Sequence, residues 1–155
     1  MKRFLVVSLL IAVLLSACGT AAMQGEGVQE DLLVTIYKLP TWGCCGTWTE
    51  YLKGNGFKVK TENVETLVEV TTRYQVPAEL QSCHTAIVDG YVVEGHVPVA
   101  EIERLLQERP DVIGIAVAGM PAGAPGMDIE GFDSESFDVV TFDKEGTIQI
   151  YSSYQ

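Results

Sequence analysis

Apolar and polar positions in the central part of the chain alternate in a pattern that predicts strands separated by helices. The segment Leu32 to Tyr37 is apolar and rich in β-branched residues, which is typical of a buried strand. A helix is expected to follow, because Trp48 and Leu52 recur at helical spacing before the glycine-rich stop Gly54-Asn55-Gly56. Phe57 to Thr61 then predicts a second short strand.

The pattern continues with a second helix and a hairpin. Asn63 is placed to cap that helix and Pro77 to close it, and its apolar stripe consists of Val64, Leu67, Val68 and Tyr74. Two short strands, Thr85 to Val88 and Tyr91 to Val93, flank Asp89-Gly90, a dipeptide typical of a type I′ turn.

A third helix is predicted to begin at Pro98 and to stop at Arg109-Pro110, with Ile102, Leu105 and Leu106 on its apolar face. The complete order, β-α-β-α-β-β-α over residues 32–118, is that of the thioredoxin fold. Its alternating first half implies parallel strand pairing, and the hairpin supplies an antiparallel edge.

A Gly/Pro/Met loop and a second hairpin follow this predicted thioredoxin-like α/β domain. The loop is Gly119 to Met127, and the hairpin strands are Phe137 to Phe142 and Thr147 to Tyr151, around the turn Asp143 to Gly146. We expect residues 119–151 to pack on the same domain as residues 32–118.

The composition of residues 1–17 is typical of an export signal. Lys2 and Arg3 precede Phe4 to Leu15, an almost wholly apolar run that is too short to span a bilayer. The order Leu15-Ser16-Ala17-Cys18 matches a bacterial lipobox, which predicts cleavage before Cys18 and lipidation of that cysteine. Residues 18–31 are small and polar and are expected to form a flexible tether between lipid and domain.

This leader predicts a periplasmic protein held at the membrane by acyl chains alone, and Gly19 after the cysteine favours the outer membrane. Without Lys2 and Arg3 the chain keeps 8 basic against 21 acidic residues, a net charge of −13. Nucleic acid is not expected as a partner, because phosphate binding needs clustered lysines and arginines. The negative charge suits a protein that attracts cations, and it also serves solubility.

Three cysteines remain beyond Cys18, and they lie in the clusters Trp42-Gly43-Cys44-Cys45-Gly46 and Ser82-Cys83-His84. Three thiols cannot all pair within the chain, so a structural disulfide framework explains them poorly. In a thioredoxin-type fold the first cluster lies at the N-terminus of the first helix, where a thiolate is stabilised, and the second lies against it. The two clusters are therefore expected to form one site.

Such a site could bind a soft metal or exchange electrons through thiols. The candidate ligands are Cys44, Cys45 and Cys83, with His84 and then Met120, Met127 or His96 in support. This sulfur-rich set fits Cu(I) best and zinc less well. His96 is equally suited to a structural hydrogen bond, and a loop methionine to packing. A redox dithiol would need a disulfide from Cys83 to Cys44 or Cys45, because a bond between the adjacent cysteines would be strained.

Three segments resemble a known family: Tyr37 to Gly46, Val76 to Pro98, and Gly119 to Met127. Together with the final hairpin they are similar to the CopG-like copper-resistance proteins, also called domain-of-unknown-function family 411. The resemblance spans about Leu32 to Tyr151. It implies a periplasmic, thioredoxin-like protein that binds copper through cysteines, is able to cycle copper redox states, and is encoded beside copper efflux and resistance systems.

On this resemblance, Cys44 and Cys45 match the last two cysteines of a Cys-x-Cys-Cys motif, and Cys83 with His84 matches a Ser-Cys-His element. Trp42 stands where the family has the first cysteine, so this chain lacks one thiolate. The favoured interpretation is a binding protein for copper ions, with copper efflux or chaperone proteins as partners. A thiol-disulfide or copper oxidoreductase is the alternative.

Overall fold

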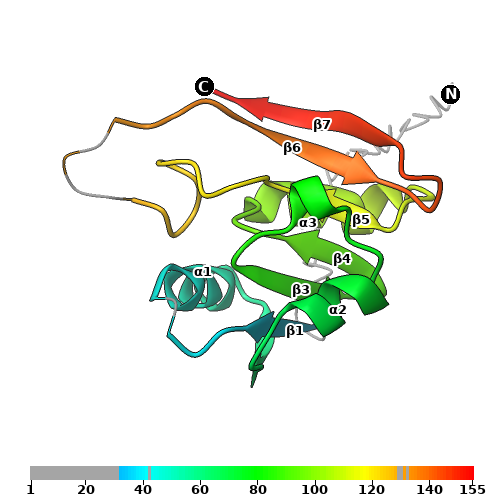
Figure 1. Ribbon diagram of the computed structural model, residues 1–155. Helices are drawn as coiled ribbons and strands as arrows, with labels where there is room; N and C mark the ends of the chain where they lie inside the picture. Colours follow the sequence, from blue (N-terminus) through cyan, green and yellow to red (C-terminus); the bar gives the residue numbers. More distant parts are fainter. Residues whose placement is uncertain (1–31, 42, 129–130, 132) are drawn as a thin grey trace, which may run out of the picture.

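The computed structural model describes residues 32–41, 43–128, 131 and 133–155. The predicted signal peptide, the tether with Cys18, and Trp42 lie outside the described residues. The elements along the chain, labelled in Figure 1, are β1 (Leu33–Lys38), α1 (Gly43–Gly54), β2 (Lys58–Asn63), α2 (Val68–Arg73), the 3₁₀ turn η1 (Ala78–Leu80), β3 (His84–Val88), β4 (Tyr91–Glu94), α3 (Val99–Glu108), β5 (Gly114–Ala116), β6 (Phe137–Phe142) and β7 (Ile148–Tyr154).

The strands form one mixed sheet in the order β2-β1-β3-β4-β5-β6-β7. The pairs β1–β2 and β4–β5 are parallel, and the other neighbouring pairs are antiparallel. The hairpin β6–β7 lies at one edge of the sheet, far from β1 (Figure 1). The predicted mixed α/β fold is therefore confirmed.

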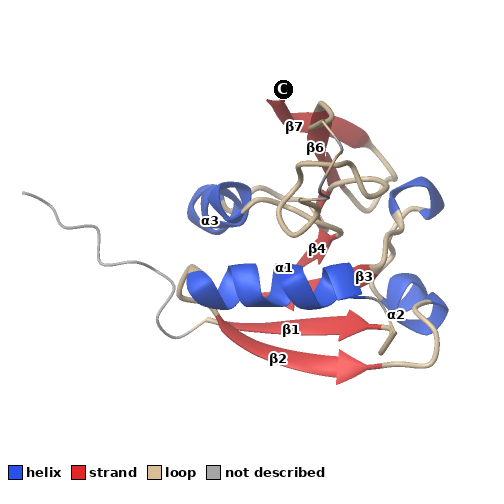
Figure 2. Cartoon of the chain, turned by 90° about the vertical axis from the view of Figure 1, so that its left-hand side faces the viewer, coloured by secondary structure: helices blue, strands red, loops and turns tan. Residues whose placement is uncertain are grey.

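Two apolar clusters place the helices on the two faces of the sheet. The first cluster joins Trp48 and Leu52 of α1 and Ile102 and Leu105 of α3 to one face. The second joins Val76, just before η1, and Leu80, the last residue of η1, to Val92 and Phe142 on the other. This division follows from strand alternation, because Val92 and its neighbour Val93 belong to different clusters. Figure 2 shows the helices and strands from a second direction.

The second helix is shorter than predicted. Asn63 does not cap it, because β2 extends along β1 until Asn63 pairs with Lys38, and the backbone N–H of Val64 then donates to the Lys38 carbonyl. The helix begins only at Val68. Pairing with β1 thus outweighs the local helical pattern, so the residues predicted to begin the helix lie in β2 and in the segment after it.

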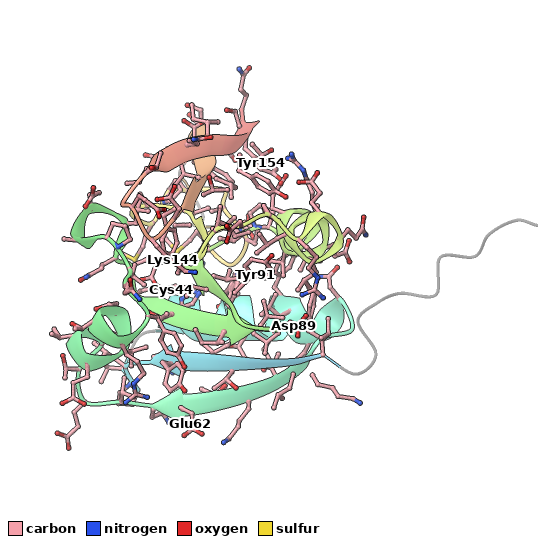
Figure 3. All side chains as sticks on the ribbon, turned by 90° about the vertical axis from the view of Figure 1, so that its right-hand side faces the viewer. Cys44, Glu62, Asp89, Tyr91, Lys144 and Tyr154 are labelled. Carbon is pink, nitrogen blue, oxygen red and sulfur yellow. The ribbon has the colours of Figure 1, made fainter. Side chains whose placement is uncertain are left out.

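The sequence pattern also missed β5. This strand is only three residues long, too short to show any periodicity, yet it joins the C-terminal hairpin to the rest of the sheet between β4 and β6. The turn between β3 and β4 agrees with the prediction: Asp89, labelled in Figure 3, and Gly90 have φ values of 45° and 86°, as a type I′ turn requires. Among the described residues, no helix has both the length and the apolar character needed to cross a membrane.

Candidate metal centre

The fold brings the two cysteine clusters together, as predicted. Cys44 and Cys45 lie in the first turn of α1, Cys83 and His84 at the start of β3, and His96 just beyond β4. Their donor atoms form two groups, Cys44–Cys83–His96 and Cys45–Cys83–His84, and within each group all atoms lie within 4.8 Å of one another. Cys83 belongs to both groups.

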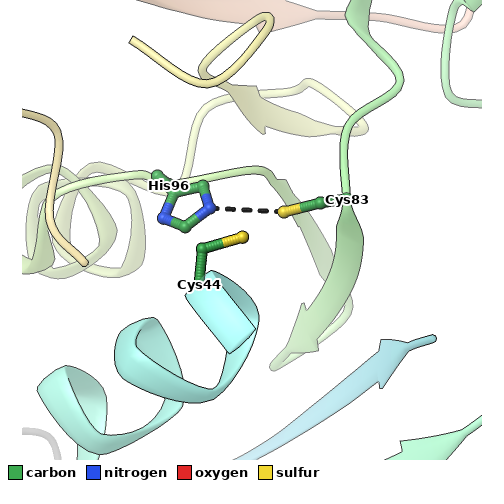
Figure 4. Close-up of side chains that lie close together, drawn as sticks. All are labelled: Cys44, Cys83 and His96. Atoms are coloured by element: carbon green, nitrogen blue, oxygen red, sulfur yellow. Dashed lines mark hydrogen bonds between the residues drawn. The ribbon is translucent and has the colours of Figure 1, made fainter. Parts of the chain in front are cut away.

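The Cys83 sulfur lies at the centre of this arrangement. It is 3.1 Å from Nδ1 of His84 and 3.2 Å from Nε2 of His96. The Cys44 sulfur points toward the same space from the tip of α1 (Figure 4). The Cys45 thiol donates to the Cys83 carbonyl at 3.4 Å.

The centre is almost wholly enclosed. Cys45, Cys83, His84 and His96 are all at most 2 % exposed, whereas Cys44 is partly exposed. All three thiols are free, and no disulfide joins the described cysteines. A ligand or partner reaching the centre therefore meets Cys44 first.

His96 makes the structural hydrogen bond considered for it and also lies among the candidate ligands. Its Nδ1 lies 2.8 Å from the Pro125 carbonyl, which can only accept, so Nδ1 carries the proton and donates. Nε2 is the nitrogen that faces Cys83, at 3.2 Å from its sulfur. A histidine held through one nitrogen and open at the other is the usual arrangement of a metal-ligating histidine.

His84 is buried against aromatic surface. Its ring centre lies 4.4 Å from that of Trp48 and 5.1 Å from that of His96. Burial, reinforced by the neighbouring His96 and Lys38, lowers the pKa of His84 to about 3, so its imidazole is neutral at physiological pH. Its Nε2 is buried without a hydrogen-bond partner among the described residues.

The cysteine thiols repel one another's ionisation. The hydrogen bond to Cys45 and then burial raise the pKa of Cys83 far above its ordinary value, and His96 opposes this only partly. Burial and the nearby Cys83 raise the pKa of Cys44. A bound cation would remove this penalty, because it stabilises the thiolates that otherwise repel.

The Gly/Pro/Met loop covers the centre. Besides the Pro125 contact, Gly126 lies so close to α1 that a Cβ there would be 2.9 Å from the Trp48 backbone nitrogen. Met127 is buried and Met120 is 47 % exposed. Their role as ligands stays a prediction.

Trp48 is a site residue that sequence analysis placed only in the core. Its Nε1 donates to the Val97 carbonyl at 3.0 Å, which fixes the indole against His84. Its helical spacing gave no sign of this role, because an apolar stripe looks the same whether or not it supports a site.

The chain is similar to known proteins at the level of family and structure. Residues 80–127, which include Cys83, His84 and His96, match the family described as "Protein of unknown function, DUF411". Two solved structures of the copper resistance protein CopG also match. Form 2 shares 41 % identity, covers 80 % of this chain and 98 % of its own, and has a TM-score of 0.73. For form 1 the values are 38 %, 79 %, 96 % and 0.74. No curated protein matches the chain significantly.

Proposed function

The chain belongs to the DUF411 family as a homologue of the copper resistance protein CopG, and from this premise we propose that it binds Cu(I) through its Cys–His cluster. The observation that carries the proposal is the position of Cys83, which is shared by two groups of three potential ligands. Thiolate sulfur bridges readily between soft metal ions. The protein is therefore proposed to hold two Cu(I) ions that share the Cys83 sulfur.

The chemistry of the donors supports Cu(I) over zinc. The five donors are three thiols and two imidazoles, a soft set that suits Cu(I). Structural zinc is almost always four-coordinate, whereas each group here offers three ligands. The raised pKa values of Cys44 and Cys83 also fit a site that ionises its thiols only when a cation binds.

The alternative of a thiol-disulfide oxidoreductase has less support. We propose a thioredoxin-like topology for β1 to α3, supported by the strand order β2-β1-β3-β4 with β1 and β2 parallel. Reactive cysteines in redox proteins have lowered pKa values, however, and those of Cys44 and Cys83 are raised. A role in copper redox cycling is therefore secondary to binding.

Export and lipidation at Cys18 remain proposals from the sequence alone, with the outer membrane as the proposed location. An envelope protein of this kind would exchange copper with efflux or chaperone proteins. Cys44 supports such exchange, because it is the one thiol of the cluster that is not buried. An incoming donor can attack a metal there without opening the core.

Titration of the reduced, purified protein with Cu(I) against a colorimetric chelator tests the proposal. We expect two equivalents to bind tightly to the wild type and none to Cys83→Ser. Thr47→Ser is a control close to the centre, because Thr47 is exposed on α1, the helix that carries Cys44 and Cys45, and its replacement should leave both equivalents in place. Unchanged binding by Cys83→Ser would refute the proposal.

A further inference from the structure

Glu94, the last residue of β4, is an acidic side chain buried close to the metal centre. It is 0 % exposed, although burying a carboxyl group is costly unless it is hydrogen-bonded. Strand alternation places it on the face of Val92, away from the apolar cluster that packs around α1. Neither group of candidate metal ligands includes it. Its burial therefore needs another explanation.

The carboxyl group holds the backbone immediately before Cys83. Its Oε1 accepts the backbone N–H of Ser82 at 2.7 Å. The carboxyl group also interacts with the side chain of Thr85, which is paired with Glu94 across β3 and β4. The hydrogen bond to Ser82 is the one that fixes the residue next to the shared sulfur.

Two further contacts fix the same segment. The Ser82 hydroxyl donates to the Gly119 carbonyl at 3.1 Å, at the start of the loop that covers the centre. Gly95, which follows Glu94, lies so close that a Cβ there would be 3.0 Å from the Ser82 hydroxyl oxygen and 2.5 Å from the Val117 carbonyl. Ser82, which is partly exposed, is therefore held by Glu94 and Gly95 on one side and by the Gly119 carbonyl on the other.

We propose that Glu94 is a positioning residue for Cys83, which it places at the point shared by the two Cys–His groups without touching the metal. The inference rests on the proposed copper-binding function. A leucine would fill the position without the cost of burying a polar group, but it could not accept from Ser82. Glutamine could, because its amide oxygen occupies the place of Oε1.

The experiment compares Glu94→Leu, Glu94→Gln and Thr85→Val. Thr85 is paired with Glu94 across β3 and β4 and its side chain interacts with that carboxyl group, so Thr85→Val tests whether the contact with Ser82, and not the contact with Thr85, positions Cys83. Two quantities are measured: Cu(I) affinity by chelator competition, and the alkylation rate of Cys83 relative to Cys44 in the metal-free protein. Circular dichroism verifies the fold.

We expect Glu94→Leu to lose about tenfold or more in Cu(I) affinity, as is typical when a group supporting a metal ligand is removed, and to change the alkylation ratio. Glu94→Gln and Thr85→Val should stay close to the wild type. Wild-type values for Glu94→Leu, or an equal loss in Glu94→Gln, would overturn the proposal.

Two further outcomes remain decisive. If Glu94→Leu does not fold, Glu94→Asp takes its place, because its shorter side chain withdraws the acceptor from Ser82; undiminished affinity there would also overturn the proposal. If the wild type itself binds no Cu(I), the proposed function fails, and the alkylation ratio alone decides whether Glu94 positions Cys83.

Discussion

Replacing His84 by asparagine should make the metal-free protein less sensitive to acid. In the folded protein the pKa of His84 is lowered to about 3, first by burial and then by His96 and Lys38, against an ordinary value of 6.5. Between these two values the unfolded chain binds a proton that the folded chain rejects. The stability that neutral His84 provides is therefore complete above pH 6.5 and is lost as the pH falls toward 3.

The expected size of this effect is large for a domain of this length. The interval between 6.5 and about 3 corresponds to at most about 5 kcal/mol, a substantial part of the ~5–15 kcal/mol that stabilises a typical domain. Glu94 changes the free energy of unfolding in the opposite direction. Burial raises its pKa from 4.5 to about 7, so the stability that it provides in the protonated form is lost as the pH rises from 4.5 to 7. The effect of His84 should consequently be clearest below about pH 4.5 in the wild type.

Urea unfolding of reduced, metal-free protein at several pH values, followed by tryptophan fluorescence, measures this. The free energy of unfolding of the wild type should fall relative to His84→Asn as the pH is lowered from 7 to 3.5. The comparison cancels the other carboxyl groups, which both proteins share. Parallel curves, with a constant difference at every pH, would show that His84 is not held neutral by the fold.

Three further predictions concern the centre and its supports. Cys44→Ser should still bind one equivalent of Cu(I), because Cys44 belongs to one ligand group only, whereas Cys83→Ser should bind none. Equal losses of Cu(I) in chelator titrations of the two variants would contradict the shared-sulfur arrangement. Glu94→Gln should gain stability relative to the wild type as the pH rises from 4.5 to 7, by up to about 3 kcal/mol in urea unfolding, because it cannot ionise; a flat difference would count against this. Gly126→Ala should lower the free energy of unfolding by about 1–3 kcal/mol more than Gly131→Ala, because both glycines have positive φ but only a Cβ at Gly126 would meet a backbone nitrogen of α1. Similar melting temperatures of the two variants would contradict this.

Local sequence patterns predicted those parts of the fold whose residues interact with near neighbours. The hairpin around Asp89-Gly90 and the helix α3, which begins after Pro98, appear where their turn and capping residues placed them. The start of α2 could not be predicted in the same way, because Asn63 is held by Lys38 on another strand. Pairing between distant strands leaves no signal in the local sequence. For the same reason β5, which is defined by its pairing with β4 and β6, could not be predicted.

The clustering of the site residues could be predicted from the sequence, but the contacts around them could not. The order of elements was enough to bring Cys44 and Cys45 to Cys83, although they lie almost forty residues apart. The contacts that tune the centre were not predictable, among them the Pro125 carbonyl that sets the tautomer of His96. Each of these depends on a loop carbonyl or a buried side chain whose position only the complete packing determines. Trp42, the main departure from the family pattern, lies outside the described residues.

The chemistry of the metal-free thiols favours metal uptake over disulfide exchange. Disulfide exchange requires a thiolate, but burial and mutual repulsion keep Cys83 and Cys44 protonated. A bound Cu(I) ion would offset both obstacles, because its charge would stabilise the thiolates in a site that water hardly reaches. Binding should accordingly release protons and strengthen as the pH rises. On the proposed function, the enclosed position of Cys83 would keep the thiol protonated in the metal-free protein and would let it ionise only when a metal binds.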